Sequence, residues 1–302
     1  MSMNHSPDGG VLTSQHYLDL WRTPELSSRS VQIWADAFLL AAVQLGVELL
    51  VEVGAHEAWA SRAICARGKR AIAIEANPAV ARHYSMNLPA CVRYINCAVG
   101  SSCGEQTLYI PDSSRLLPTT SSLRERSSTR GRLDGCTVAC HTLDCILRMD
   151  QEDACTSSLP GGFPDFVPRI ALWIDVEGSL RDVMSGAERL LQSESVVAIY
   201  AELEDEAVWE GQWTTQEAIS LFATAGLVVW GSDCQTSGQR NFVFLRETDF
   251  EAVVGIRARA LQGCDGLVKQ SESLRFRAWR ALYPLRNRLR LRSRMRTLLA
   301  KY

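Results

Sequence analysis

Two short segments of the chain, which begin 21 residues apart, each end an apolar run in an acidic residue. The first is 50–55, in which Glu52 precedes Gly54, and the second is 71–78, in which Glu75 closes the run. Buried parallel strands have such apolar runs, and ligands bind where the carboxyl ends of those strands meet. A glycine turn lets the backbone approach a ligand, and a carboxylate accepts hydrogen bonds from both hydroxyls of a ribose. The pattern predicts a site for a nucleoside-containing cofactor.

A further acidic pair, Asp175 and Glu177, follows another apolar run, and its spacing places both side chains on one face of an extended strand. We predict that Asp175 faces the reacting atoms and that Glu177 orients it or fixes the turn. The alternative is that both acids only cap the helix that follows. Histidine is the usual base near neutral pH, so His141 is a catalytic candidate and His56 is a second one. For each histidine the alternative is a structural or solvated role.

Metal ligands have two candidate sources. Glu202 ends a further strand and is followed by acids at 204–206, and clustered oxygens suit a hard cation. We favour a solvated acidic rim instead. The chain also has ten cysteines but no Cys-x-x-Cys pair, and one sequence cluster fits no common zinc knuckle. That cluster consists of Cys136, Cys140, His141 and Cys145. The remaining cysteines fall in apolar patterns, so we predict reduced thiols and no bound metal.

Apolar runs and helical spacings alternate along the chain. The expected strands are 48–53, 70–75, 92–99, 104–110, 138–141, 170–176, 196–203, 227–231 and 241–245. The expected helices are 17–45 as one or two helices, 57–66, 78–88, a short helix from 143, 179–192 and 215–225. This alternation favours an α/β fold with an open, mostly parallel sheet and helices on both faces. Segments 112–135 and 151–168 are rich in loop-forming residues and are expected to be long loops.

Length and composition bound the organisation. A chain of 302 residues with 46% apolar residues has ample material for one large core. The predicted division is an N-terminal disordered or helical extension (1–46), a central catalytic domain (47–250) and a C-terminal helical, Arg-rich tail (251–302). The longest apolar stretch, 31–53, contains five polar residues and is too polar to span a bilayer. With a polar N-terminus, this favours a cytoplasmic protein.

The C-terminal tail differs in charge from the rest of the chain. From Arg275 onward it contains nine arginines, Lys301 and no acid, whereas the preceding part holds 22 basic residues against all 34 acids, a balance of −12. Leucines near helical spacing make the tail a basic amphipathic segment, which is typical of elements that contact an anionic membrane surface, here at the inner membrane face. Nucleic acid is one alternative partner. Docking on the acidic body of the same chain is another.

Six elements then occur in a fixed order, beginning with Glu52-x-Gly54-x-x-x-Ala58. The others are Glu75-Ala76-Asn77-Pro78, Asn96-Cys97-Ala98-Val99-Gly100, Ser121-Ser122-Leu123, Thr142-Leu143-Asp144 and Ile174-Asp175-Val176-Glu177-Gly178. Together they resemble the FkbM-type methyltransferases over roughly residues 47–246. The most specific part is the last element with Ala98-Val99-Gly100 upstream.

The resemblance implies a class I, Rossmann-like methyltransferase fold, S-adenosylmethionine as cofactor, and O-methylation of a hydroxyl on a glycan or similar metabolite. The cofactor-binding candidates are Glu52, Gly54, Ala55, His56, Glu75, Ala76, Asn77, Asn96, Ala98 and Asp175. The catalytic candidates are Asp175, Glu177 and His141. The substrate-binding candidates are Ser121 and Ser122, in a loop that lies near the active site in the family, and Glu202.

Four residues depart from the family pattern. Glu52 replaces Asp, His56 replaces an amide, Ala58 adds a methyl group where Gly is usual, and Trp173 stands where a Lys is often found. These changes predict a reshaped pocket, and they keep open a non-catalytic binding module as an alternative. A nicotinamide-dependent oxidoreductase is disfavoured because its Gly-x-Gly-x-x-Gly turn is absent. A nucleic-acid methyltransferase is suggested only by the Arg-rich tail.

Overall fold

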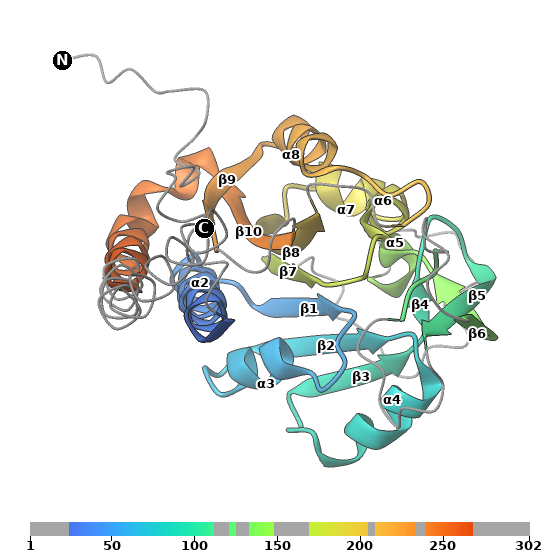
Figure 1. Cartoon of the computed structure of the whole chain (residues 1–302). Coiled ribbons are helices and arrows are strands. Elements are labelled where there is room, and N and C mark those ends of the chain that lie inside the picture. Colours follow the sequence, from blue (N-terminus) through green and yellow to red (C-terminus); the bar gives the residue numbers. More distant parts are fainter. Residues whose placement is uncertain are drawn as a thin grey trace, which may run out of the picture.

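The fold is that of a computed structural model, which describes residues 24–111, 121–124, 133–147, 169–204, 209–233 and 239–267. A seven-stranded sheet in the order β3-β2-β1-β7-β8-β10-β9 forms its centre (Figure 1). Its strands are β1 (Leu49–Val53), β2 (Arg70–Glu75), β3 (Val92–Asn96), β7 (Ile170–Ile174), β8 (Val196–Glu204), β9 (Leu227–Ser232) and β10 (Gln239–Arg246). Only β10 runs antiparallel to its neighbours, β8 and β9. The predicted mostly parallel α/β sheet is thus confirmed.

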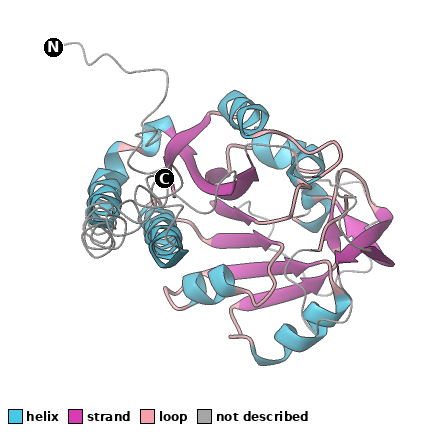
Figure 2. Cartoon of the chain, in the orientation of Figure 1, coloured by secondary structure: helices cyan, strands magenta, loops and turns pink. Residues whose placement is uncertain are grey.

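Helices cover both faces of this sheet (Figure 2). The helices are α2 (Pro24–Gln44), α3 (Trp59–Cys65), α4 (Pro78–Tyr84), α5 (Leu143–Ile146), α6 (Leu180–Ser185), α7 (Glu188–Gln192), α8 (Thr215–Thr224) and an unlabelled helix at 254–267. All five residues of β1 are buried, and alternate side chains enter different cores. Leu50 packs with residues of α2 and α3, whereas Val51 packs with residues of α5 to α8. Because both faces of β1 are covered, its residues other than Glu52 are apolar, which explains the apolar run in its sequence.

A second sheet of three strands departs from the prediction. Residues 92–99 do not form one strand, because β3 ends at Asn96 and β4 (Ala98–Val99) pairs with another partner. That partner is β6 (Leu133–His141), which also pairs with β5 (Gly104–Pro111). β6 begins earlier than the predicted strand 138–141, so the expected long loop is shorter. The small sheet lies at one end of the main sheet (Figure 1), and β4 contributes to the site described below.

The predicted helix over 179–192 is wrong in its continuity. The chain forms α6 and α7, which are separated at Gly186. A Cβ atom at Gly186 would lie 2.1 Å from the carbonyl oxygen of Gly100, so the two segments are in close contact there. The Asp144 carboxylate then accepts hydrogen bonds from the backbone amides of Arg189 and Leu190, at 3.0 and 2.9 Å. Carboxylates stabilise helix N-termini, so Asp144 fixes the start of α7.

The two ends of the described chain meet on one face of the sheet. The helix at 254–267 buries Ile256, Ala260 and Cys264 in the same core as α2, beside which it lies in Figure 1. The predicted domain boundary at 250 therefore falls just before a helix that packs on the core. Residues 1–23 and the Arg-rich segment from 268 onward lie outside the described residues. Among the residues described, no helix has the length and apolar character needed to cross a membrane.

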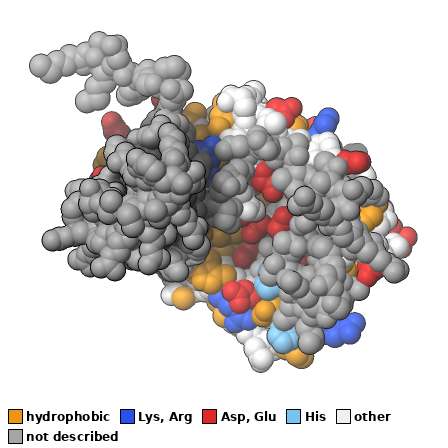
Figure 3. Space-filling view, viewed as in Figure 1, with side chains coloured by type: hydrophobic (Ala, Val, Ile, Leu, Met, Phe, Trp, Pro, Cys, Tyr) orange, Lys and Arg blue, Asp and Glu red, His pale blue; other side chains and the backbone are white. Residues whose placement is uncertain are grey.

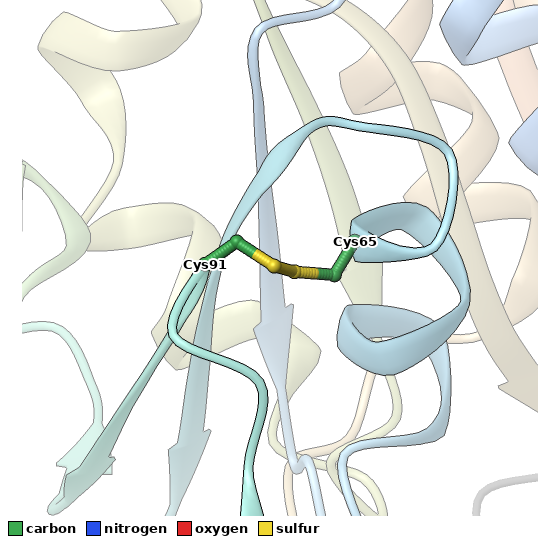
Figure 4. Close-up of a disulfide and its surroundings, with 2 residues drawn as sticks. All are labelled: Cys65 and Cys91. Carbon is green, nitrogen blue, oxygen red and sulfur yellow. A yellow bond between two sulfur atoms is a disulfide. The ribbon is translucent and has the colours of Figure 1, made fainter.

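Cys65 and Cys91 form a disulfide, which corrects the prediction that all the cysteines are reduced thiols (Figure 4). Cys65 ends α3, and Cys91 immediately precedes β3. The bond closes a loop with a sequence separation of 26 residues that contains all of β2 and α4. The cellular location stays a prediction, because a disulfide favours an oxidising compartment and the sequence favours the cytoplasm.

Reduction of this disulfide is expected to destabilise the protein. For a loop of this size, loss of the cross-link removes about 3 kcal/mol of unfolding free energy. Thermal unfolding followed by circular dichroism, with and without a phosphine reductant, measures the effect. The double variant Cys65→Ala/Cys91→Ala is the control, because its melting temperature should not respond to the reductant. A wild-type melting temperature that ignores the reductant would contradict the pairing.

Candidate active site

A cavity of about 460 Å³ opens at the carboxyl ends of β1, β2 and β7. The strand order reverses between β1 and β7, and open α/β sheets bind ligands at such a point. Acidic side chains gather near the middle of the face shown in Figure 3, next to hydrophobic ones. The predicted site residues that line the cavity are Glu52, Gly54, Ala55, His56, Glu75, Ala76, Ala98, Ser121, Ser122, Asp175 and Glu177. Residues from distant parts of the sequence are therefore brought together as the motifs indicated.

Gly54 makes the turn after β1 possible. Its φ is +77°, which favours glycine, and a Cβ atom there would lie 1.7 Å from the carbonyl oxygen of Asp175. The β1 and β7 turns are tied together, because the amide of Asp175 donates a hydrogen bond to the carbonyl of Val53 at 3.0 Å. Any side chain at position 54 would push the two turns apart. The glycine of the first motif thus fixes the distance between the cofactor turn and the acidic pair.

The Glu52 side chain points at the start of α3 and fixes the turn that precedes this helix. Its carboxylate accepts hydrogen bonds from the backbone amides of Ala60 and Ser61, at 3.1 and 2.7 Å. The side chain is buried, and the loss of solvation raises its pKa to about 7 despite these bonds. Glu52 therefore reaches the cavity wall as a residue that positions α3. Its assignment as a direct cofactor ligand stays a prediction.

This buried acid should make stability depend on pH. The pKa of Glu52 is raised from 4.5 to about 7 on folding, so the folded state binds its proton more tightly than the unfolded state. The unfolding free energy of the wild type is therefore expected to fall as pH rises from about 4.5 to about 7, by roughly 3 kcal/mol from this group. Urea unfolding of wild type and Glu52→Gln across this range isolates the contribution, since the side-chain amide of the variant cannot ionise. Parallel pH profiles for the two proteins would contradict it.

The turn between Gly54 and α3 has two non-glycine residues in the left-handed region. His56 has a φ of 43°, and Ala58, which precedes the first residue of α3, has a φ of 58°. Both positions are among the departures from the family pattern. A β-carbon in this region costs about 1 kcal/mol, so the turn is held by its surroundings. The backbone amide of His56 donates to Glu75 at 2.9 Å, which is one such restraint.

Replacing Ala58 by glycine is expected to change the unfolding free energy by less than about 1 kcal/mol, because relief of the left-handed conformation offsets the loss of a buried methyl group. Ala63→Gly, in the interior of the same helix, is the matched control and should lower the unfolding free energy by about 1 kcal/mol. Urea midpoints of the two variants and the wild type measure both effects. If Ala58→Gly destabilises as Ala63→Gly does, the left-handed conformation of residue 58 is contradicted.

Glu75 lies at the end of β2, where its two carboxylate oxygens accept hydrogen bonds from different turns. Oε2 accepts from the amide of His56 at 2.9 Å, and Oε1 accepts from the amide of Asn77 at 2.8 Å. Burial raises the pKa of Glu75, and these amide bonds act in the opposite direction. Each carboxylate oxygen retains a second acceptor position. Glu75 can therefore shape the turn and still accept hydrogen bonds from a ligand.

Asp175 lines the cavity at the turn after β7. Its side chain is exposed by surface area, yet loss of solvation between the cleft walls raises its pKa to about 6, and the negative charges of Glu75 and Glu204 act in the same direction. A carboxylate with a pKa near 6 is ionised at neutral pH and remains basic enough to accept a proton.

The acidic pair lies close together, but not for the predicted reason. β7 ends at Ile174, and Glu177 has a φ of 44°, so the two acids belong to a tight turn and do not share the face of a strand. Ligand oxygens of Asp175, Glu177 and Glu202 all lie within 4.8 Å of one another. Glu202 reaches this group from β8, and it also accepts a hydrogen bond from Gln239. Such acidic groups are common without a metal, and Asp205 and Glu206 lie outside the described residues.

The two predicted substrate serines both have protein partners. The hydroxyl of Ser122 donates to the carbonyl of Glu177 at 2.6 Å, and Ser121 accepts from the Asn77 side chain at 3.2 Å. Arg124 extends this contact by binding Asp182 of α6 at 2.7 Å. Segment 121–124 is thereby fastened across the turn after β7. Ser122 restrains the acidic turn, and a substrate role for either serine stays a prediction.

Besides Glu202, three predicted residues lie away from the described lining. His141 ends β6, and its side chain lies with Cys103 and Cys145. Asn96 donates its side-chain amide to the carbonyl of Glu75 at 2.7 Å, and Asn77 caps α4 by accepting from the Ala79 amide at 3.0 Å. The two asparagines therefore fix the backbone around Glu75. A catalytic role for His141 stays a prediction, and His56 is the histidine that lines the cavity.

The cavity also has an aromatic wall that the motifs did not identify. Trp59 and Trp173 line it, with ring centroids 5.6 Å apart. Behind them Trp173 stacks on Tyr200 at 3.8 Å and an interplanar angle of 12°. Val31, Gln32 and Ala35 of α2 complete this side. In the sequence Trp173 stands out only as a departure from the family, and nothing in the sequence of α2 shows that it would reach the site.

The sequence model of a protein family, described as the Methyltransferase FkbM domain, matches residues 52–229, which is more than half of the chain. This range contains the Gly54 turn, Glu75 and the acidic pair, which are the features that build the cavity. The chain belongs to the FkbM methyltransferase family. Its predicted family, its class I fold and its S-adenosylmethionine cofactor are thereby confirmed, and the reaction class is methyl transfer.

Solved structures give more distant likenesses to this FkbM methyltransferase. A 1,6-didemethyltoxoflavin-N1-methyltransferase of Burkholderia thailandensis is 11% identical, with a TM-score of 0.35 and coverage of 82% of this chain and 92% of that one. The magnesium protoporphyrin IX methyltransferase of Synechocystis PCC 6803 is 10% identical, with a TM-score of 0.37 and coverage of 80% and 86%. No curated protein matches the chain. Likenesses this distant show neither the acceptor nor the reacting atom.

The charge of the cavity fits the cofactor of an FkbM methyltransferase. The lining residues with carboxyl groups, within the described part of the chain, are Glu52, Glu57, Glu75, Asp175 and Glu177, and no lysine or arginine is among the described lining residues. All are acidic, and the field they create attracts cations and repels phosphates. S-adenosylmethionine bears a net positive charge and, when bound, supplies an electrophilic methyl group. We expect Glu75 and the Gly54 turn to hold its nucleoside, whereas a dinucleotide with two phosphates is poorly matched.

Proposed function

We propose that this chain transfers the methyl group of S-adenosylmethionine to a hydroxyl oxygen of an uncharged, sugar-like acceptor. The observation that carries the proposal is the combination, in one cavity, of an acidic charged lining with the Trp59–Trp173 wall. Flat aromatic rings offer apolar area to the faces of a ring-shaped acceptor, and carboxylates accept hydrogen bonds from its hydroxyls. A polyanionic acceptor, such as a nucleic acid, would meet repulsion from the same lining.

We assign to Asp175 the role of the base that accepts the proton of the acceptor hydroxyl. An alcohol is a weak nucleophile, and a base that accepts its proton as the new bond forms accelerates the reaction by about 10² to 10⁴. Asp175 is exposed to the cavity and has a pKa raised to about 6, which suits this role at neutral pH. Glu177, Ser122 and the Gly54 turn hold Asp175 in place. Alignment of the reacting atoms by the cavity supplies the rest of the acceleration.

An acceptor screen tests the proposal. Purified full-length protein is incubated with methyl-labelled S-adenosylmethionine and separate pools of monosaccharides and glycosides, phenols, amines and oligonucleotides. We expect label in a carbohydrate or polyol pool, and an O-methyl resonance in the nuclear magnetic resonance spectrum of the product. Label transferred only to amines or oligonucleotides would contradict the proposal. Cofactor binding without transfer to any pool would instead favour the non-catalytic binding module.

A further inference from the structure

A group of three metal-ligating side chains lies outside the cavity. Cys103 is in the turn between β4 and β5, His141 is the last residue of β6, and Cys145 belongs to α5. One ligand atom from each, two sulfurs and one imidazole nitrogen, lies within 4.8 Å of the other two. We call these residues the Cys103–His141–Cys145 cluster. The sequence pointed to His141 and Cys145, but Cys103 arrives from a segment almost 40 residues upstream.

The backbone around this cluster is already arranged. Val99 pairs with His141 across β4 and β6, and the amide of Gly100 donates to the carbonyl of His141 at 3.1 Å. On the other side, the Thr142 hydroxyl accepts from the amide of Cys145 at 3.0 Å and fixes the start of α5. The three side chains are thus presented by secondary structure and by a short turn, as a preformed site requires.

The imidazole gives an independent sign of a missing partner. The Nδ1 atom of His141 is buried and makes no hydrogen bond with the described residues. Buried polar atoms are nearly always paired, so an orphan of this kind needs an explanation. Cys145 is also buried, at 2% exposure, whereas Cys103 is exposed and leaves the site open to solvent on one side. An ion that binds the two sulfurs and the Nδ1 atom of His141 would satisfy the imidazole, and the exposed side of the site would admit a water molecule.

We propose that the Cys103–His141–Cys145 cluster binds a zinc ion through two thiolates and one imidazole. Sulfur and imidazole ligands select zinc over the hard cations, and three protein ligands with a water complete a tetrahedron. Zinc–ligand bonds of about 2.0–2.3 Å place tetrahedral ligands roughly 3.5–4 Å apart. From the 4.8 Å limit on their separation, the ligand atoms need to approach one another by at most about 1.3 Å to reach that geometry.

Zinc at this cluster would affect the methyltransferase by stabilising its structure. It would join the turn after β4 to the end of β6 and to α5. Cys97, Ala98 and Val99, which immediately precede that turn, line the cavity. Zinc binding should therefore stiffen one wall of the cavity without supplying a group to the reacting atoms. We expect a higher melting temperature when zinc is bound. We expect no change in the arrangement of the residues that form the acidic turn.

Cobalt titration of the full-length protein tests the site, under argon and without added reductant, so that the free thiols stay reduced and the Cys65–Cys91 disulfide stays intact. We expect one Co²⁺ per chain with the near-ultraviolet absorption of cobalt–thiolate bonds, and displacement of Co²⁺ by Zn²⁺. Cys103→Ser, on an exposed turn, and Cys145→Ser should each weaken binding by at least about tenfold. Cys136→Ser, which removes a thiol of β6 outside the cluster, is the matched control and should bind like the wild type. Added Zn²⁺ should raise the melting temperature of the wild type and of Cys136→Ser only.

Three results would overturn the proposal. The folded wild type could show no cobalt–thiolate absorption, or both Cys103→Ser and Cys145→Ser could retain wild-type affinity. Peptide mapping of the purified, unreduced protein could instead find a Cys103–Cys145 disulfide. Because none of these readouts uses activity, failure of the zinc site would leave the proposed methyl transfer untouched.

Discussion

Replacing Glu75 by alanine is expected to weaken the binding of S-adenosylhomocysteine about 100-fold. The carboxylate lies on the cavity and keeps acceptor positions beyond its two backbone bonds. Hydrogen bonds to a charged group contribute about 1.5–3 kcal/mol each, and two ribose hydroxyls would each lose one in the variant. Equilibrium dialysis with labelled S-adenosylhomocysteine measures the dissociation constants of wild type and variant.

Two controls separate ligand binding from damage to the turn. Glu75→Gln keeps the shape of the side chain and should bind more tightly than Glu75→Ala. Asn77→Ala removes the cap of α4 beside the same turn, so it should lose about 1 kcal/mol of stability and little affinity. Wild-type affinity in a folded Glu75→Ala protein would show that the nucleoside does not depend on Glu75. Equal losses in Glu75→Ala and Asn77→Ala would assign the effect to the backbone.

Asp175→Asn is expected to lower the rate of methyl transfer by about 10² to 10⁴ while leaving S-adenosylhomocysteine affinity within a few-fold of the wild type. Asparagine preserves size but cannot accept the proton of the acceptor hydroxyl. Single-turnover transfer to the acceptor found by the screen measures the rate, and dialysis measures the affinity. Glu177→Gln is the companion variant, and because it changes the neighbour of Asp175, its effect should be smaller.

The pH profile gives a second measurement of the same role. The pKa of Asp175 is raised to about 6, and the base is competent only when ionised. The wild-type rate should therefore fall as pH drops through about 6, whereas the residual rate of Asp175→Asn should lack this limb. Retention of the wild-type rate by Asp175→Asn would remove Asp175 from the chemistry. The same acid limb in both proteins would assign the titration to another group.

Much of the fold could be predicted from local sequence because its strands are buried on both faces. β1 and β2 are runs of apolar residues with an acid near the end. Pro78 marked the start of α4, since proline is tolerated in the first turn of a helix. The positive φ of Gly54 and the capping box of α8 also depend on residues that are neighbours in the sequence.

The remaining features depend on contacts between distant segments. β4 separates from β3 because it pairs with β6, and the break at Gly186 reflects close contact with Gly100. Neither partner is near in sequence. The disulfide has the same cause, because spacing alone does not show which of ten cysteines lie together. α2 reaches the cavity only through the way it packs on the sheet.

The site residues also divide into those that local sequence predicts and those that depend on contacts between distant segments. The motif residues at the strand ends, Glu75 and Asp175, reach the cavity because parallel strands bring their carboxyl ends to one edge. His141 has suitable chemistry for a base, but a strand of the second sheet carries it to the cysteine cluster. Residue type indicated which chemistry each side chain could perform, and the topology of the fold determined which side chains lie together in the cavity.

The most direct measurement is calorimetric titration of the full-length wild type with S-adenosylhomocysteine, and separately with a nicotinamide dinucleotide. We expect one molecule of S-adenosylhomocysteine to bind per chain with a micromolar dissociation constant, and no heat from the dinucleotide, whose phosphates meet the acidic lining. Absence of S-adenosylhomocysteine binding by the folded protein, or preference for the dinucleotide, would contradict the assignment of this cavity to a methyl donor.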